Sequence, residues 1–179
     1  MSINGKMFTT PKGPCDFPWL TEKDTKFDPE GIYHTKATFK KAECENLVTA
    51  INGAIANQVK IQHDADPTKK ITYANKPFKD VGNDELEFTF KTKFKPNLLD
   101  NNKKALADDV QIWKDSVVRI VFETHGYNQA VGIGCKLYPL TVQVLELVTG
   151  TPGVKLGDLK VEPDVEPDVE PKKKGTISL

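Results

Sequence analysis

The chain of 179 residues contains 25 Lys and Arg against 25 Asp and Glu, so its formal net charge is zero. That length is sufficient for one domain with a substantial core, and the neutral total excludes the uniformly basic composition of proteins that bind nucleic acid through charge alone. The charges are unevenly placed, because the segment from Asp158 onward holds six acids and four lysines and leaves the preceding residues at +2.

The three cysteines and three histidines are scattered, and neither a C-x-x-C nor an H-x-x-x-H spacing occurs. A structural zinc site therefore has no support. An odd number of cysteines without a signal-peptide pattern favours reduced thiols, and no stretch approaches the ~20 apolar residues of a membrane span. We expect a soluble, intracellular protein that holds neither a metal nor a cofactor.

Two large aromatic side chains stand in a proline-rich stretch near the N-terminus. A short strand is predicted at residues 6–10, and the stretch Pro11–Leu20 follows it. Proline removes backbone donors and forbids a regular helix, so we expect an extended loop or an edge segment. Phe17 and Trp19 are candidates for stacking on a ligand, and the alternative is that they close the end of a barrel.

The stretch Gly31–Lys40 alternates with the period of two that is typical of a strand. Tyr33 shares the parity of the apolar residues, and Lys36 shares the opposite, cationic parity. Between residues 42 and 58 the apolar residues recur instead at helical spacing, which predicts one amphipathic helix packed against the sheet.

A strand with a row of lysines is the strongest signal in the chain. Within Leu86–Lys95, one parity holds Leu86, Phe88, Phe90, Thr92 and Phe94, and the other holds Lys91, Lys93 and Lys95. This pattern predicts either a solvated outer face or a cationic surface for a polyanion. The preceding loop, residues 59–84, interleaves lysines with Tyr73 and Phe78, and predicts either an ordinary surface loop or a lid over such a groove.

The last elements expected to contribute to the core are a strand at residues 116–124, a turn at His125–Asn128 and a returning strand at residues 129–148. Gly132 and Gly134 indicate a kink or bulge in that return. Beyond it, a proline-containing tetrapeptide is repeated three times between Val161 and Lys172. Such a repeat cannot bury a core, so it predicts an acidic, disordered or extended tail with a basic C-terminus.

These elements predict an all-β protein with one helix, in the form of an OB-like five-stranded antiparallel barrel. The barrel domain is expected at residues 1–150 and the tail at 151–179. The helix follows the second long strand, whereas an OB barrel usually places it after the third. A strand hidden among the prolines of 15–20 would remove that conflict, and a β-sandwich is the alternative fold.

We expect a binding protein and no enzyme. The chain lacks a phosphate-binding G-x-x-x-x-G-K-[ST] loop, and no set of acids has the spacing of a metal cage. A binder of single-stranded nucleic acid needs cations for the phosphates and flat rings for the bases. The candidate residues for these two roles are Phe17, Trp19, Tyr33, Lys36, Tyr73, Lys91, Lys93, Lys95, Trp113, Arg119, Tyr127 and Lys136.

Three stretches resemble phage-encoded single-stranded DNA-binding proteins with an OB fold. They are Pro77–Glu85 with the lysine strand, Ile112–Arg119, and Gly132–Leu137 with residues 142–144. The resemblance covers residues 7–148. The sequence departs from the family pattern at an insertion within Asp80–Asp84, at Asp115-Ser116 where a glycine is usual, and at the lysine-rich end of the tail.

The resemblance implies a protein that coats single-stranded DNA without sequence preference during phage replication and recombination, and that promotes annealing. It also implies residence in the cytoplasm of the infected bacterial host, replication proteins as partners of the tail, and a monomer or homodimer. Two alternatives stay open at this stage. One is an assembly protein of a virion or complex, whose aromatic loops bind protein, and the other is an RNA-binding barrel.

Overall fold

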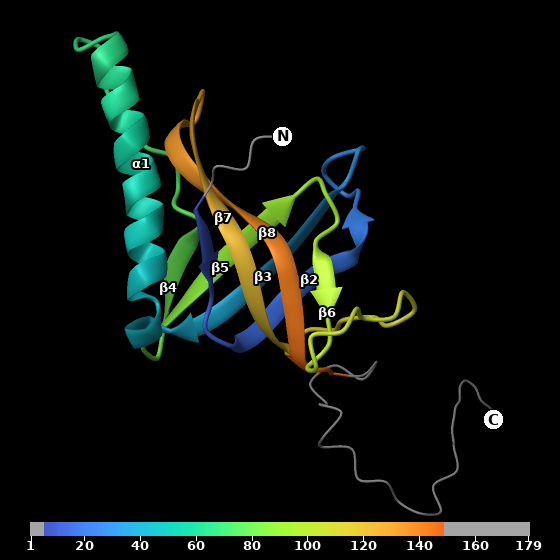
Figure 1. Cartoon of the computed structure of the whole chain (residues 1–179). Helices are drawn as coiled ribbons and strands as arrows, with labels where there is room; N and C mark the ends of the chain where they lie inside the picture. Colours follow the sequence, from blue (N-terminus) through green and yellow to red (C-terminus); the bar gives the residue numbers. More distant parts are fainter. Residues whose placement is uncertain (1–5, 149–179) are drawn as a thin grey trace, which may run out of the picture.

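The computed structural model describes residues 6–148, which form eight strands, one α-helix and a short 3₁₀ turn at Lys41–Glu43. The strands are β1 (Met7–Thr9), β2 (Gly13–Asp24), β3 (Ile32–Lys40), β4 (Phe78–Gly82), β5 (Glu85–Thr92), β6 (Asn97–Leu99), β7 (Val117–Gln129) and β8 (Gly132–Glu146). They are paired in the order β4-β5-β3-β2-β7-β8-β6, with β1 added beside β7. The sheet curves around one core, and the helix α1 (Glu45–Ala65) flanks it (Figure 1).

The core lies on the inner face of the curved sheet, as the alternation predicts. In β5, Leu86, Phe88 and Phe90 are buried, and β3 contributes Ala37 and Phe39. Phe90 packs edge-on against Phe122 of β7, with ring centroids 5.3 Å apart. The paired strands therefore bury one continuous apolar layer, which is the main source of stability in a domain of this kind.

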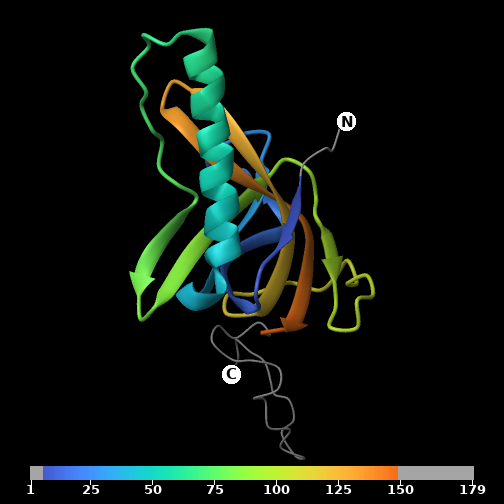
Figure 2. The ribbon, with the colours of Figure 1, turned by 60° about the vertical axis from the view of Figure 1, so that its left-hand side comes forward.

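The helix covers the β7 and β8 side of the core. Its buried residues are Leu47, Ile51, Ile55 and Gln62. A Cβ atom on Gly126 of β7 would come within 2.8 Å of the Ala54 carbonyl oxygen, so the close approach of helix and strand requires glycine there. The connection after the helix returns alongside it to β4 (Figure 2).

The predicted mostly-β fold with one helix is confirmed, but the predicted five-stranded antiparallel barrel is wrong. Eight strands are present where five were expected, and within residues 6–148 no pairing joins β4 to β6 to close the sheet. The pairing is not wholly antiparallel either, because β6 runs parallel to β8. The three strands that were not expected are β2, β4 and β6. Of these, β4 and β6 have five and three residues and lie at the two ends of the strand order.

The strand considered as an alternative at residues 15–20 is present, because the twelve residues of β2 include this proline-containing segment. With β2 counted, the helix follows the third strand of the chain. Phe94 is a second correction, because β5 ends at Thr92 and the Phe94 side chain is 73% exposed rather than buried. The tail predicted at 151–179 lies outside the described residues.

Candidate nucleic-acid interface

The outer face of three neighbouring strands gathers rings and cations into one surface, which we call the β2–β3–β5 patch. It consists of Phe17 and Trp19 on β2, His34 and Lys36 on β3, and Lys91 on β5. The register places Trp19 opposite His34 and His34 opposite Lys91. Directly opposed residues of antiparallel strands project to the same face, so indole, imidazole and ammonium form a row across the strands.

Phe17 reaches this face through an irregularity in β2. Its φ of 48° lies in the left-handed region, which costs a non-glycine residue on the order of 1–3 kcal/mol. The register with β3 shifts between Asp16 and Trp19, and Asp16 Oδ1 accepts a hydrogen bond from the Phe17 amide at 2.9 Å. The resulting bulge leaves the ring 55% exposed, with the Lys36 ammonium 5.7 Å from its centroid.

Trp19 is held beside His34 by a contact between β2 and β3. The ring centroids of Trp19 and His34 are 6.5 Å apart, and the indole is 38% exposed. His34 Nε2 lies 2.8 Å from Asp24 Oδ2. This hydrogen bond, with a second one from the Lys26 amide, lowers the pKa of the Asp24 carboxyl below its ordinary value. The carboxylate therefore fixes the imidazole next to the exposed indole.

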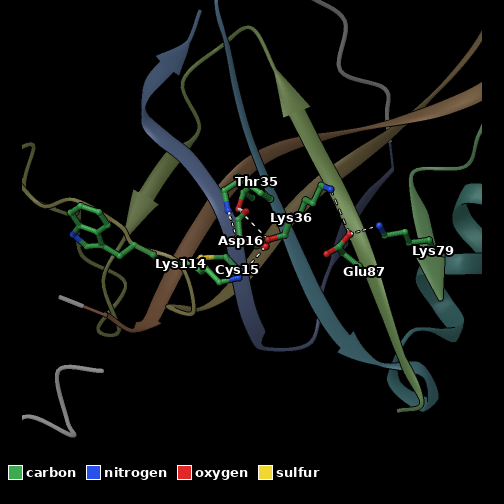
Figure 3. Close-up of polar contacts among 9 residues, drawn as sticks. Cys15, Asp16, Thr35, Lys36, Lys79, Glu87 and Lys114 are labelled. Atoms are coloured by element: carbon green, nitrogen blue, oxygen red, sulfur yellow. Dashed lines mark hydrogen bonds and ion pairs between the residues drawn. The ribbon is translucent and has the colours of Figure 1, made fainter. Parts of the chain in front are cut away.

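The lysines of the outer face differ in their partners. Within residues 6–148, no carboxylate lies at ion-pair distance from Lys91, and its side chain is exposed. Lys36 Nζ, by contrast, lies 3.7 Å from Glu87 Oε1, and Lys79 Nζ lies 3.5 Å from the same oxygen. Figure 3 shows Glu87 between these two lysines, which come from the strands on either side of β5.

A turn at residues 113–116 adds a second tryptophan at the start of β2. Cys15 Sγ donates to the Trp113 carbonyl oxygen at 3.6 Å, and Lys114 Nζ lies 3.2 Å from Asp16 Oδ2. Burial raises the pKa of the Cys15 thiol to about 12, so the thiol is a structural donor rather than a nucleophile. Trp113 is 39% exposed and borders the patch through this anchored turn.

A second group of rings and cations lies on the β7–β8 hairpin, and we call it the hairpin patch. Its members are His125, Tyr127, Lys136 and Tyr138. The rings of His125 and Tyr138 are stacked at 5.3 Å. Tyr127 lies over Gly134, where a Cβ atom would come within 2.4 Å of the phenol oxygen, and the Lys136 ammonium is 5.3 Å from its ring.

The remaining predicted residues are dispersed. Tyr33 is half-buried on the parity opposite to His34, with the Lys23 ammonium 5.9 Å from its ring. The Tyr73 side chain is 64% exposed, and the backbone of Tyr73 forms an isolated β-bridge with Ile133. Arg119 is exposed on β7 opposite Gln143.

Lys93 and Lys95 lie beyond the end of β5 rather than on its outer face. Lys93 Nζ is 4.0 Å from Glu30 Oε1. Lys95 borders a pocket of about 380 Å³ formed by β6, residues 105–108, Thr21 and Thr141. The predicted lysine row is therefore correct for Lys91 and wrong in position for the other two.

Sequence reasoning missed His34, Lys79 and Lys114 as members or neighbours of the patch. His34 lies on the outer parity of its strand, and no spacing rule connects it to its partner Asp24, which is ten positions away across a loop. Lys79 belongs to β4, which was predicted as turn and loop. Lys114 was seen only as part of a motif, and its contact with Asp16 depends on the tertiary fold.

Two further features of the described residues bear on function. Within residues 6–148, no group of three or more His, Cys, Asp or Glu side chains is placed to hold a metal ion. The single helix of this region is too polar to cross a membrane.

The fold is shared with solved structures of phage proteins. The single-stranded DNA-binding protein gp2.5 encoded by bacteriophage T7 is similar with a TM-score of 0.70 and 25% sequence identity, over 82% of this chain and 95% of that one. The single-stranded DNA-binding protein from bacteriophage Enc34, in complex with single-stranded DNA, gives a TM-score of 0.57 at 15% identity, over 77% and 85%. Its C-terminally truncated form gives 0.58 at 14%, over 78% and 84%.

The resemblance drawn from the sequence is confirmed, because these structural neighbours are phage single-stranded DNA-binding proteins. At 14–15% identity, the Enc34 structures show a common fold only. No protein-family model matches the chain, and no curated protein matches it.

Proposed function

We propose that this protein binds single-stranded DNA without sequence specificity, through the β2–β3–β5 patch. The observation that carries the proposal is the row of Trp19, His34 and Lys91 across three strands, with Phe17 and Lys36 beside it. Bases stack on exposed rings whatever their identity, and lysines neutralise the phosphates between them. The similarity in fold to T7 gp2.5 supports the same assignment.

The architecture suits this task. We interpret the open, curved sheet as OB-like, and the outer face of β3 and β5 as the surface that OB folds use for oligonucleotides. Base stacking contributes roughly 1–3 kcal/mol per base, so two exposed rings and a few lysines give useful affinity. The chain acts in this proposal as a binding protein, not an enzyme.

The biological setting follows from the same resemblance. The protein would protect single strands during phage replication and recombination, and promote their annealing, in the cytoplasm of the infected bacterial host. The acidic repeat within 151–179 would recruit replication proteins. The protein would act as a monomer or a homodimer.

The test is fluorescence anisotropy of a labelled thymidine oligomer titrated with the full chain, at several salt concentrations. We expect saturable binding that weakens as salt rises, because counterions released from phosphates drive part of the affinity. Competition with unlabelled duplex DNA should be poor, and competition with a uridine oligomer measures the preference between DNA and RNA. Absence of binding at low salt, or stronger competition by the uridine oligomer than by the thymidine oligomer, would overturn the proposal.

A further inference from the structure

Glu87 is a carboxylate that lies between two lysines on the outer face of the sheet. It lies on the outer face of β5, directly opposite Lys79 of β4 and diagonal to Lys36 of β3. One of its oxygens, Oε1, is 3.5 Å from Lys79 Nζ and 3.7 Å from Lys36 Nζ (Figure 3). Both separations exceed the 2.7–2.9 Å of a charge-assisted hydrogen bond, so the carboxylate sits between two ammonium groups without being locked to either.

The side chains of Lys36, Lys79 and Glu87 differ in their exposure to solvent. The Glu87 side chain is 17% exposed, whereas those of Lys36 and Lys79 are 34% and 66% exposed. The carboxylate therefore lies below the ammonium groups. An anion that approaches from solvent reaches the lysines before it reaches Glu87.

The Lys36 end of the trio lies beside an exposed aromatic ring, that of Phe17. The Lys36 ammonium contacts the Phe17 ring at 5.7 Å on one side and Glu87 on the other. A base stacked on the exposed face of Phe17 would thus have its phosphate near Lys36 and Lys79. The ion pairs at Asp16, Asp24, Glu30, Asp64 and Asp80 differ from this arrangement, because each joins one cation to one carboxylate.

We infer that Lys36 and Lys79 form a subsite for a DNA phosphate, and that Glu87 is a built-in competitor for it. In the free protein the carboxylate neutralises part of the charge of the two lysines and keeps them together. When a phosphodiester binds, it takes over both ammonium groups against the repulsion of Glu87. The carboxylate thereby limits the affinity of this part of the face and keeps the strand exchangeable. This inference rests on the proposed function, because the ligand is the backbone of single-stranded DNA.

The test is the salt-dependent affinity of the full-length Glu87→Gln variant for the labelled thymidine oligomer. Glutamine keeps the length of the side chain and a carbonyl oxygen that accepts hydrogen bonds from the lysines, so the strand register is preserved. Each phosphate contact contributes about 0.7 to the slope of log K against log salt for single strands, which is about fivefold in affinity at ~0.1 M salt. We therefore expect binding about fivefold tighter than wild type, with a slope steeper by about 0.7.

The control is Glu43→Gln, in the 3₁₀ turn after β3, which removes the same charge away from the trio. It should leave the affinity within a factor of two of wild type. The gain from Glu87→Gln should also disappear in a background that carries Lys36→Gln and Lys79→Gln. Lys79 is largely exposed, so Lys79→Gln alone is a second probe that should not disturb the fold. This substitution should weaken DNA binding more in the Glu87→Gln variant than in the chain that keeps Glu87.

The outcomes separate the inference from the function. An affinity of Glu87→Gln equal to that of the control, or a gain that persists without the two lysines, would overturn the competitor role. Weaker binding by Glu87→Gln would show that the carboxylate positions the lysines for DNA, which also contradicts it. A wild-type chain that fails to bind the oligomer overturns the proposed function itself, and the subsite with it.

Discussion

The β2–β3–β5 patch and the hairpin patch contain the same kinds of side chain, but their aromatic rings differ in exposure and in what they contact. In the first, Phe17 and Trp19 are 55% and 38% exposed, and a strand bulge turns Phe17 outward. In the second, Tyr127 covers Gly134, and His125 is stacked on Tyr138. Aromatic and cationic residues in a sequence therefore do not by themselves indicate a binding face.

The difference lies in what the faces of the rings contact. A ring that lies over a glycine replaces a missing side chain and stabilises the sheet. A ring that stands out of a bulge gives up that stabilisation and keeps one face available for a base. We therefore propose that DNA binds at the β2–β3–β5 patch and that the hairpin patch stabilises the sheet.

The largest expected effect is the loss of stacking at the β2–β3–β5 patch. Trp19→Ala and Phe17→Ala should each weaken binding of the thymidine oligomer by about tenfold or more, since stacking contributes roughly 1–3 kcal/mol per base. Anisotropy titrations measure the affinity, and thermal unfolding verifies that the variants fold. Tyr127→Ala is the matched control, and an equal loss of affinity in that variant would remove the distinction between the patches.

The next effect concerns stability of the hairpin. Tyr127→Ala uncovers Gly134 and should lower the free energy of unfolding by about 1–2 kcal/mol, in line with partial burial of a large side chain. Gly134→Ala should also destabilise the protein, because its Cβ would come within 2.4 Å of the Tyr127 phenol oxygen. Urea unfolding of the two single variants and the double variant should show that Gly134→Ala costs less once the ring is gone.

A smaller effect is expected from single lysines. Lys91→Gln removes an exposed cation with no carboxylate partner within the described region, so it should lower the slope of log K against log salt by about 0.7 and the affinity about fivefold at ~0.1 M salt. Lys136→Gln, in the hairpin patch, should change both quantities less. A larger loss from Lys136→Gln would move the interface to the hairpin.

The smallest effect concerns pH. The pKa of Asp24 is lowered in the folded state, chiefly by the hydrogen bond from His34, and its ordinary value is 3.8. The folded state then binds fewer protons than the unfolded state, so this stabilisation is present above pH 3.8 and is lost as the pH falls through the lower, folded pKa. Urea unfolding of wild type and Asp24→Asn should differ at pH 6 and converge toward pH 2. A constant difference across that range would contradict the assignment.

The sequence was sufficient to predict the strands that alternate and the helix. In β3 and β5, one parity is buried and the other faces solvent, because a half-buried strand requires that pattern. The strand β2 was only an alternative, because Pro14 and Pro18 favour an extended loop or an edge segment. Pro18 falls within the irregular part of the β2–β3 pairing, between Asp16 and Trp19, where a missing amide donor does not interrupt a regular ladder.

The candidate site was predictable in composition but not in arrangement. Trp19, Phe17, Lys36 and Lys91 were all candidates, yet their grouping depends on the register between three strands that are far apart in the chain. Tyr127 was a candidate for the same reason, and only the packing over Gly134 shows its structural use. The Lys36–Glu87–Lys79 trio depends on β4, a strand with no alternating pattern in the sequence.

The most direct measurement is the emission of Trp19 alone during titration with the thymidine oligomer. Trp113→Phe leaves Trp19 as the single tryptophan, because the chain contains two. We predict saturable quenching that gives the same affinity as the anisotropy titration and shifts to higher oligomer concentration as salt is raised. An oligomer that binds by anisotropy without any change in Trp19 emission would show that DNA does not lie on the β2–β3–β5 patch.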